Sequence, residues 1–132
     1  GEVRQAQVHG PAGVARGEGD LGSAHATGTK MGDVIEAQAI ANIYGDRPPV
    51  VALKSYMGHT MGACGVIETL MTLYMIQDGM IAPTLNLDEV DKRCAGVRHV
   101  TAHQPADLRI AAVQNFAFGG VNTCLLIRRA DE

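Results

Sequence analysis

The sequence of 132 residues contains no tryptophan, only 4% aromatic residues and only three cysteines. Cys64, Cys94 and Cys124 are widely spaced and form no Cys-x-x-Cys pair, so neither a zinc site nor a disulfide framework is predicted. No apolar run approaches the roughly 18 residues that a membrane-spanning helix needs. We therefore expect a protein of the reducing cytoplasm that has no membrane partner.

The sequence also has no excess of positive charge. Its 11 lysine and arginine residues stand against 14 aspartate and glutamate residues, which gives a formal net charge of -3 and a pI near 5.9. Nucleic-acid binding depends on clustered cations that displace the counterions of the phosphates. We therefore expect no nucleic-acid partner.

Small aliphatic side chains are abundant: the sequence is 46% hydrophobic and has 16 glycines. This composition favours an α/β fold over an all-β sandwich. Residues 1–20 contain five glycines and no apolar periodicity, which predicts a flexible lead-in. The ordered domain is therefore predicted to span residues 21–132.

Apolar periodicity predicts two helices, over residues 31–44 and 58–77. The second is apolar nearly all round, which is typical of a helix buried inside a domain. Short apolar runs predict strands at residues 50–53, 81–87, 97–100, 110–116 and 122–128. The last two are predicted to pair as a hairpin, so we expect a mixed β-sheet layered with helices.

The segment His25-Ala26-Thr27-Gly28-Thr29 places an imidazole and two hydroxyls between a strand-like run and a helix-like run. These groups are suited to bind the amides and carbonyls of a ligand, and Gly28 permits a tight turn. The alternative interpretation is a capped helix start with an exposed histidine.

A second segment runs from Lys54 to His59 and begins at the end of a predicted buried strand. An unpaired ammonium would be costly there, so Lys54 needs an acidic partner. Glu68 is the candidate because it interrupts the apolar helix. The alternative is that Glu68 lies on a solvated face of that helix.

A third segment, Phe118-Gly119-Gly120, lies in the predicted hairpin turn. Two glycines after an aromatic residue make a loop that could move and swing one large side chain. The alternative is an ordinary turn with a phenylalanine in the core.

Taken together, these segments resemble the C-terminal half of the β-ketoacyl synthases, the thiolase-fold condensing enzymes of fatty-acid and polyketide synthesis. The resemblance covers about Leu21 to Arg129 and rests on the segments at residues 25–29, 32–39, 54–59, 82–87 and 117–122. Ala26 and Ala117 stand where the family usually has glycine.

The resemblance implies a decarboxylative Claisen condensation between malonyl and acyl thioesters. It also implies no metal and no diffusible cofactor, because an acyl carrier protein brings the phosphopantetheine. In the implied roles, His25 and His59 stabilise the enolate, while Lys54 and its partner Glu68 tune the site. Pantetheine and acyl-chain contacts are implied for Thr27, Thr29, Phe118, Gly119 and Gly120.

No cysteine lies in the sequence context of the family's nucleophile. Cys64, between Ala63 and Gly65, is interpreted as a small buried hydrophobe. The nucleophile is therefore expected from a missing N-terminal half or a sister subunit, in an assembly expected to be dimeric. A half fold should also expose apolar surface, so we expect the isolated chain to associate.

Two other functions remain open at this point. The first is a non-catalytic, chain-length-factor-like binding partner, although the presence of both histidines and Lys54 weighs against it. The second is a metal hydrolase that uses His25, Asp33 and His59. The absence of His-x-His or His-x-x-x-His spacing makes that second reading weak.

Overall fold

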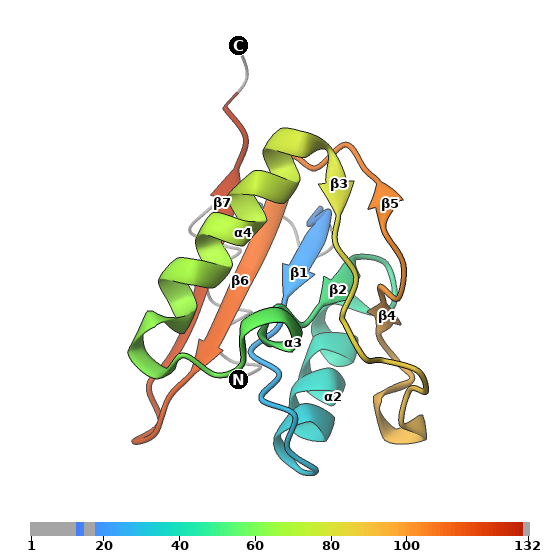
Figure 1. Ribbon diagram of the computed structural model, residues 1–132, viewed down its shortest axis with the longest axis vertical. Helices are drawn as coiled ribbons and strands as arrows, with labels where there is room; N and C mark the ends of the chain where they lie inside the picture. Colours follow the sequence, from blue (N-terminus) through green and yellow to red (C-terminus); the bar gives the residue numbers. More distant parts are fainter. Residues whose placement is uncertain (1–12, 15–17, 131–132) are drawn as a thin grey trace.

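The computed structural model describes residues 13–14 and 18–130. Its centre is a five-stranded sheet with the strand order β4-β2-β1-β6-β7 (Figure 1). The strands are β1 (Leu21–Ser23), β2 (Pro49–Val51), β4 (Arg98–His99), β6 (Ile110–Phe116) and β7 (Asn122–Arg128). All neighbouring strands are parallel except β7, which runs antiparallel to β6. The mixed α/β fold predicted from the sequence is confirmed.

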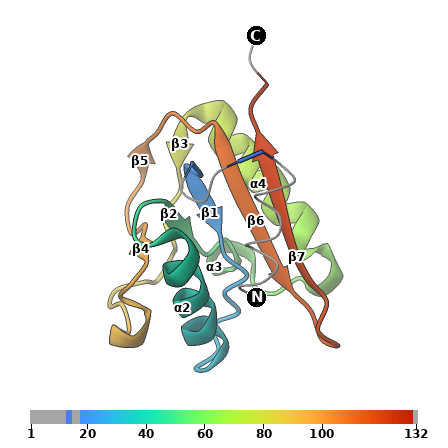
Figure 2. The same cartoon turned by 180° about the vertical axis from the view of Figure 1, so that it is seen from behind.

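Helices α2 (Gly32–Tyr44) and α4 (Cys64–Asp78) cover opposite faces of this sheet (Figures 1 and 2). The two valines of β2 show why the strand is apolar throughout. Val50 packs in the cluster that includes Ile40 of α2, whereas Val51 packs in the cluster that includes Met75 of α4. A strand buried on both faces needs an unbroken apolar run.

The hairpin of β6 and β7 has the predicted bounds. Its turn is closed by the Ala117 N–H, which donates to the Val121 carbonyl at 2.8 Å. Gly119 and Gly120 have φ angles of 83° and 80°, a conformation that favours glycine. The predicted strand at 81–87 is reduced to β3 (Met80–Ile81), which pairs with β5 (Gln104–Pro105) in a separate small sheet. A short helix, η2 (Lys92–Cys94), precedes β4.

The segment after β2 differs from the prediction. Lys54 does not end a strand: β2 ends at Val51, and Lys54 begins the short helix α3 (Lys54–Met57). The chain turns at this point because the Ser55 N–H and hydroxyl both bond to the Ala52 carbonyl. A further short helix, η1 (Met61–Ala63), precedes α4, so the predicted helix over 58–77 is divided.

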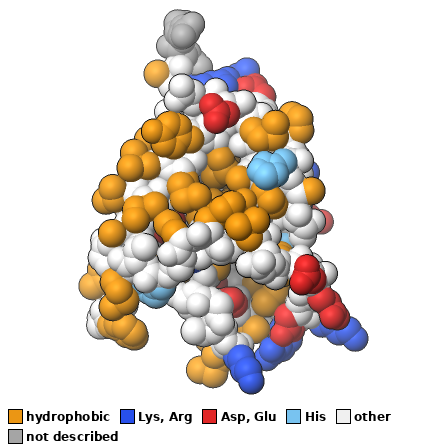
Figure 3. Space-filling view, viewed as in Figure 1, with side chains coloured by type: hydrophobic (Ala, Val, Ile, Leu, Met, Phe, Trp, Pro, Cys, Tyr) orange, Lys and Arg blue, Asp and Glu red, His pale blue; other side chains and the backbone are white. Residues whose placement is uncertain are grey.

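Helix α4 is buried on one face only, although its sequence predicted a buried helix. The sheet side holds Cys64, Glu68, Thr72, Met75 and Ile76. On the other side Val66, Leu70, Leu73 and Tyr74 are exposed. Figure 3 shows apolar side chains gathered on this face of the molecule. The composition of a helix predicts that its surface is apolar, but it does not predict whether residues of the same chain pack against that surface.

Two observations bear on the remaining expectations. The predicted lead-in over residues 1–20 lies mostly outside the described residues and stays a prediction. Among the helices that the structure describes, none has the length and apolar character needed to cross a membrane.

Candidate active site

The topology brings the sequence motifs to one edge of the sheet. Strand β1 lies between β2 and β6 and is parallel to both, so the carboxyl ends of these three strands are adjacent. His25 follows β1, the segment from Lys54 to His59 follows β2, and Asn115 lies near the end of β6. Ligands of α/β sheets bind in the crevice beyond such carboxyl ends.

His25 and His59 meet in this crevice. Their rings are edge-on, with centroids 5.4 Å apart, and both line an open cavity of about 910 Å³. Thr27, Thr29 and Phe118 line the same cavity. Five of the residues predicted for the site therefore share one cavity.

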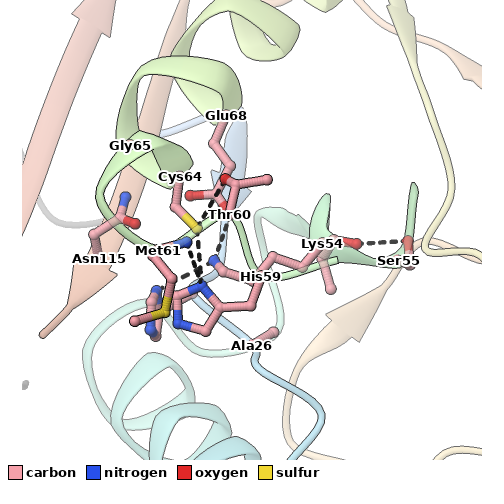
Figure 4. A network of polar contacts seen from close by, with 12 residues as sticks. Ala26, Lys54, Ser55, His59, Thr60, Met61, Cys64, Gly65, Glu68 and Asn115 are labelled. Atoms are coloured by element: carbon pink, nitrogen blue, oxygen red, sulfur yellow. Dashed lines mark hydrogen bonds and ion pairs between the residues drawn. The ribbon is translucent and has the colours of Figure 1, made fainter. Parts of the chain in front are cut away.

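Lys54 and Glu68 lie behind the histidines and form the predicted ion pair. Lys54 Nζ is 2.5 Å from Glu68 Oε1, and the two side chains are 4% and 0% exposed (Figure 4). Nζ also lies 3.2 Å from Nδ1 of His25. An ammonium has no acceptor, so Nδ1 of His25 must accept and the ring proton belongs on Nε2.

The electrostatics of His25 favour the same neutral form. Burial lowers the pKa of His25 below its ordinary value of 6.5, and the charges of Lys54 and His59 lower it further. The hydrogen bond that the ring makes to the Asn115 side chain acts in the opposite direction and raises the pKa. His25 is therefore a neutral imidazole at pH 7, with its proton on Nε2.

His59 reaches the same tautomer through different partners. The backbone N–H of Met61 donates to its Nδ1 at 3.2 Å. Nδ1 therefore carries a lone pair, and a neutral ring then has its proton on Nε2. Two imidazole N–H donors at one cavity wall can stabilise negative charge that develops on a ligand oxygen.

Glu36 of α2 holds the His25 segment in place. Its two carboxylate oxygens accept the N–H groups of His25 and Ala26 at 2.8 and 2.7 Å. Ala26 has a φ angle of 32°, which is strained for a residue with a Cβ, and these bonds fix it there. Burial raises the pKa of Glu36, and the two backbone bonds oppose that rise.

The two threonines form an exposed polar rim of the cavity. Their hydroxyl oxygens lie 3.3 Å apart, and Thr29 Oγ1 also accepts the N–H of Gly32. Phe118 is 95% exposed, which rules out the interpretation of a core phenylalanine. Gly119 and Gly120 shape the turn that carries Phe118; among the described residues, neither belongs to the cavity lining.

Comparisons with known proteins identify the family of the chain. Residues 5–88 match the family model of the β-ketoacyl synthase C-terminal domain. The chain belongs to the β-ketoacyl synthase family. The match begins inside the segment predicted as a lead-in.

Two curated relatives illustrate the relationship. The chain is 39% identical over 114 residues to 3-oxoacyl-[acyl-carrier-protein] synthase 1 of Escherichia coli K12, covering 86% of the chain and 28% of the relative. It is 40% identical over 119 residues to 3-oxoacyl-[acyl-carrier-protein] synthase 2 of Mycobacterium tuberculosis H37Rv, covering 89% and 28%. The chain thus spans little more than a quarter of these relatives.

Solved structures show the same fold. A β-ketoacyl synthase from Burkholderia phymatum STM815 matches with a TM-score of 0.93 and 41% identity, over 98% of this chain and 32% of that one. The ishigamide ketosynthase/chain length factor matches with a TM-score of 0.92 and 36% identity, over 99% and 33%. The predicted family resemblance and thiolase-like fold are confirmed.

No cysteine of this ketosynthase domain faces the cavity in the part of the chain that the structure describes. Cys64 is buried and is not part of the cavity lining. Burial raises the pKa of Cys94, and it raises that of Cys124 to about 11, so both are poor nucleophiles at neutral pH. The source of the nucleophile stays a prediction.

Sequence reasoning gave no role to three residues that the structure places at the site. Glu36 belongs to a quoted family segment, yet its contact with His25 depends on how α2 packs. Asn115 lines the cavity from β6, and Cys64 contacts His59. An acidic residue on the apolar face of α2 was the one available signal, for Glu36.

The described residues do not form the set of metal ligands that the metal-hydrolase alternative needs. Asp33 Oδ1 accepts the N–H of Gly28 at 3.1 Å, as part of the loop structure. Within residues 13–14 and 18–130, no group of three or more His, Cys, Asp or Glu side chains is arranged to hold a metal ion.

Proposed function

We propose that the chain is the C-terminal part of a β-ketoacyl-acyl-carrier-protein synthase that catalyses decarboxylative Claisen condensation. One observation carries the proposal: two imidazoles share a cavity wall, and a separate donor at Nδ1 of each leaves Nε2 as the nitrogen that carries a proton toward the cavity. The family membership and the 39% identical synthase support the reaction class.

In the proposed reaction, a cysteine outside this chain first takes the acyl group from its carrier as a thioester. Malonyl thioester then loses CO₂, and the electrons of the broken C–C bond form an enolate. His25 and His59 donate their Nε2–H groups to the enolate oxygen. The enolate carbon attacks the acyl carbonyl, a C–C bond forms, and the cysteine thiolate leaves.

Lys54 acts on this chemistry through His25. Its ammonium donates to Nδ1 and lowers the pKa of His25, so that the ring stays a neutral donor. Glu68 balances the Lys54 charge, which would otherwise be buried without a counterion. We assign Lys54 and Glu68 as positioning residues rather than groups that touch the substrate.

We further propose that an acyl carrier protein delivers the malonyl group. Thr27 and Thr29 would bond the amides of its phosphopantetheine arm, and Phe118 would gate the acyl pocket. The supporting observations are the exposed hydroxyls and the exposed phenyl ring at one cavity. A related structure, with 22% identity, is a type II polyketide ketosynthase in complex with its acyl-carrier protein.

The rest of the synthase is proposed to cover α4. Its outer face exposes Val66, Leu70, Leu73 and Tyr74, and the chain spans only 28% of the length of the Escherichia coli synthase 1. Exposed patches of this kind mark interfaces. We expect the isolated chain to self-associate in light scattering, and Leu70→Gln with Leu73→Gln to reduce that association. A monomer of unchanged size in both forms would contradict this assignment.

The decisive experiment follows malonyl-carrier protein by intact mass in the chain assembled with its cysteine-bearing half. We expect loss of CO₂ to fall about 100-fold or more in His25→Ala and in His59→Ala, the size of losing an oxyanion donor. His103→Ala is the matched control, because His103 is exposed and is not part of the cavity lining. Unchanged decarboxylation in both site variants would refute the proposal.

A chain-length-factor-like binding partner is the second candidate. It is favoured by the finding that no described cysteine lines the cavity, and by the 36% identical ketosynthase/chain length factor structure. Such a partner would bind carrier protein, yet His25→Ala would not change the rate at which the assembly releases CO₂.

A further inference from the structure

His59 has a second polar neighbour that the proposed reaction does not use. Cys64, the first residue of α4, places its Sγ 3.0 Å from Nδ1 of His59 (Figure 4). The hydroxyl of Thr60 donates to the same sulfur at 3.3 Å. Cys64 is 1% exposed, whereas His59 is exposed, so the contacts are buried at the sulfur and reach the surface at the ring.

The protons of this cluster can be assigned by counting donors. The Met61 N–H points at Nδ1 of His59, so Nδ1 accepts. The Thr60 hydroxyl donates a hydrogen bond to the sulfur, and the thiol of Cys64 donates to Nδ1, whose lone pair is shared between the thiol and the Met61 N–H. A thiolate with an imidazolium would instead set the Met61 N–H against a protonated Nδ1, and it would bury the negative charge of the thiolate.

We propose that Cys64 is a positioning residue for His59. The chain of bonds from Thr60 to Cys64 to His59 holds the ring in its Nε2–H tautomer and fixes its orientation toward the cavity. This inference rests on the proposed function for its catalytic meaning, because a neutral Nε2–H donor is what the enolate oxygen requires. The tautomer itself can be tested independently of any activity.

The same geometry argues against a role for Cys64 as the nucleophile. A cysteine beside a histidine is often activated for attack, but such a sulfur must reach the substrate. Cys64 does not belong to the lining of the catalytic cavity, and its proton is directed at a nitrogen that already accepts a backbone N–H. The sulfur therefore serves the ring and does not accept the acyl chain.

The first test is NMR of the imidazole nitrogens in ¹⁵N-labelled protein at pH 7.5. We expect a pyrrole-like Nε2 and a pyridine-like Nδ1 for His59. Cys64→Ala should lower the ratio of Nε2–H to Nδ1–H tautomer roughly two- to tenfold, the effect of one net hydrogen bond. Cys64→Ser keeps a donor and should restore the ratio, while Thr60→Val should shift it in the same direction as Cys64→Ala.

Cys124→Ala is the matched control, since Cys124 lies on β7 and should leave the His59 signals unchanged. An unchanged ratio in both Cys64→Ala and Thr60→Val would overturn the inference. So would acylation of Cys64 by an acyl thioester, detected by peptide mass.

The catalytic part is tested in the assembled synthase. We expect Cys64→Ala to lower kcat for malonyl decarboxylation in proportion to the lost population of the Nε2–H tautomer, which is at most the fold-change of the tautomer ratio, with little change in KM. Cys64→Ser should recover it. A shifted tautomer with an unchanged kcat would overturn the positioning role alone. Unchanged decarboxylation in both His25→Ala and His59→Ala would instead refute the proposed function, so the two failures are distinguishable.

Discussion

Removal of the Glu68 carboxylate should destabilise the fold strongly. In Glu68→Leu, the Lys54 ammonium would remain in a site where its side chain is only 4% exposed and has lost its anionic partner. Breaking one half of a buried ion pair typically costs about 3–5 kcal/mol. For a domain of this size that corresponds to a fall in Tm of about 10–20 °C.

The reasoning makes a second, less intuitive claim. The double variant Glu68→Leu with Lys54→Met removes both charges and fills the space with apolar atoms, so it should recover most of the lost stability. Thermal and urea unfolding followed by circular dichroism at pH 7 would measure both variants. Asp107→Asn is the control, because its ion pairs with Arg109 and Arg129 are exposed and should contribute little. A double variant as unstable as Glu68→Leu would refute the account of an uncompensated buried charge.

Three further predictions concern the site. His25 in the folded chain binds its proton less tightly than in the unfolded chain, whose pKa is near 6.5, so unfolding takes up protons as the pH falls below 6.5. Its contribution to the free energy of unfolding should therefore be complete above pH 6.5 and decline below it. Lys54→Met should raise the pKa of His25 in an NMR titration. An unchanged pKa would contradict the electrostatic coupling between Lys54 and His25. Ala26→Gly should raise the free energy of unfolding by up to about 1 kcal/mol, because glycine adopts the φ of 32° with less strain; a lower value in urea unfolding would contradict the strain. Phe118→Ala should leave Tm unchanged, because the ring is 95% exposed, while it lowers condensation in the assembled synthase; a large fall in Tm would show that the ring packs in the fold.

The local sequence pattern predicted the bounds of several elements of the fold. The hairpin of β6 and β7 could be predicted to the residue, because alternating and apolar runs flank a turn that needs glycine at φ angles near 80°. Helix α2 was predicted within one residue, since its periodicity ends at Gly45, which has a φ of 68°. Such signals depend only on neighbours in the sequence.

The prediction failed where tertiary contacts overrule the local pattern. The apolar run after β2 reads as a continuing strand up to Leu53, yet bonds to the Ala52 carbonyl turn the chain into α3. Helix α4 reads as fully buried because apolar residues surround it, yet the described chain covers one face. A hydrophobic pattern does not specify which polypeptide segment packs against the apolar face of a helix.

The sequence by itself determined the types of the main elements, the family and the need of Lys54 for an acidic partner, because each follows from short-range pattern or from the cost of burying a charge. Only the tertiary structure decided which groups touch. Lys54 contacts His25, which is 29 residues away in the sequence, and Glu36 accepts the backbone N–H of His25, which is 11 residues away. These contacts exist because β1 lies between β2 and β6, so that loops distant in sequence end at one edge of the sheet. Strand order is a property of the whole fold, and no local window of the sequence encodes it.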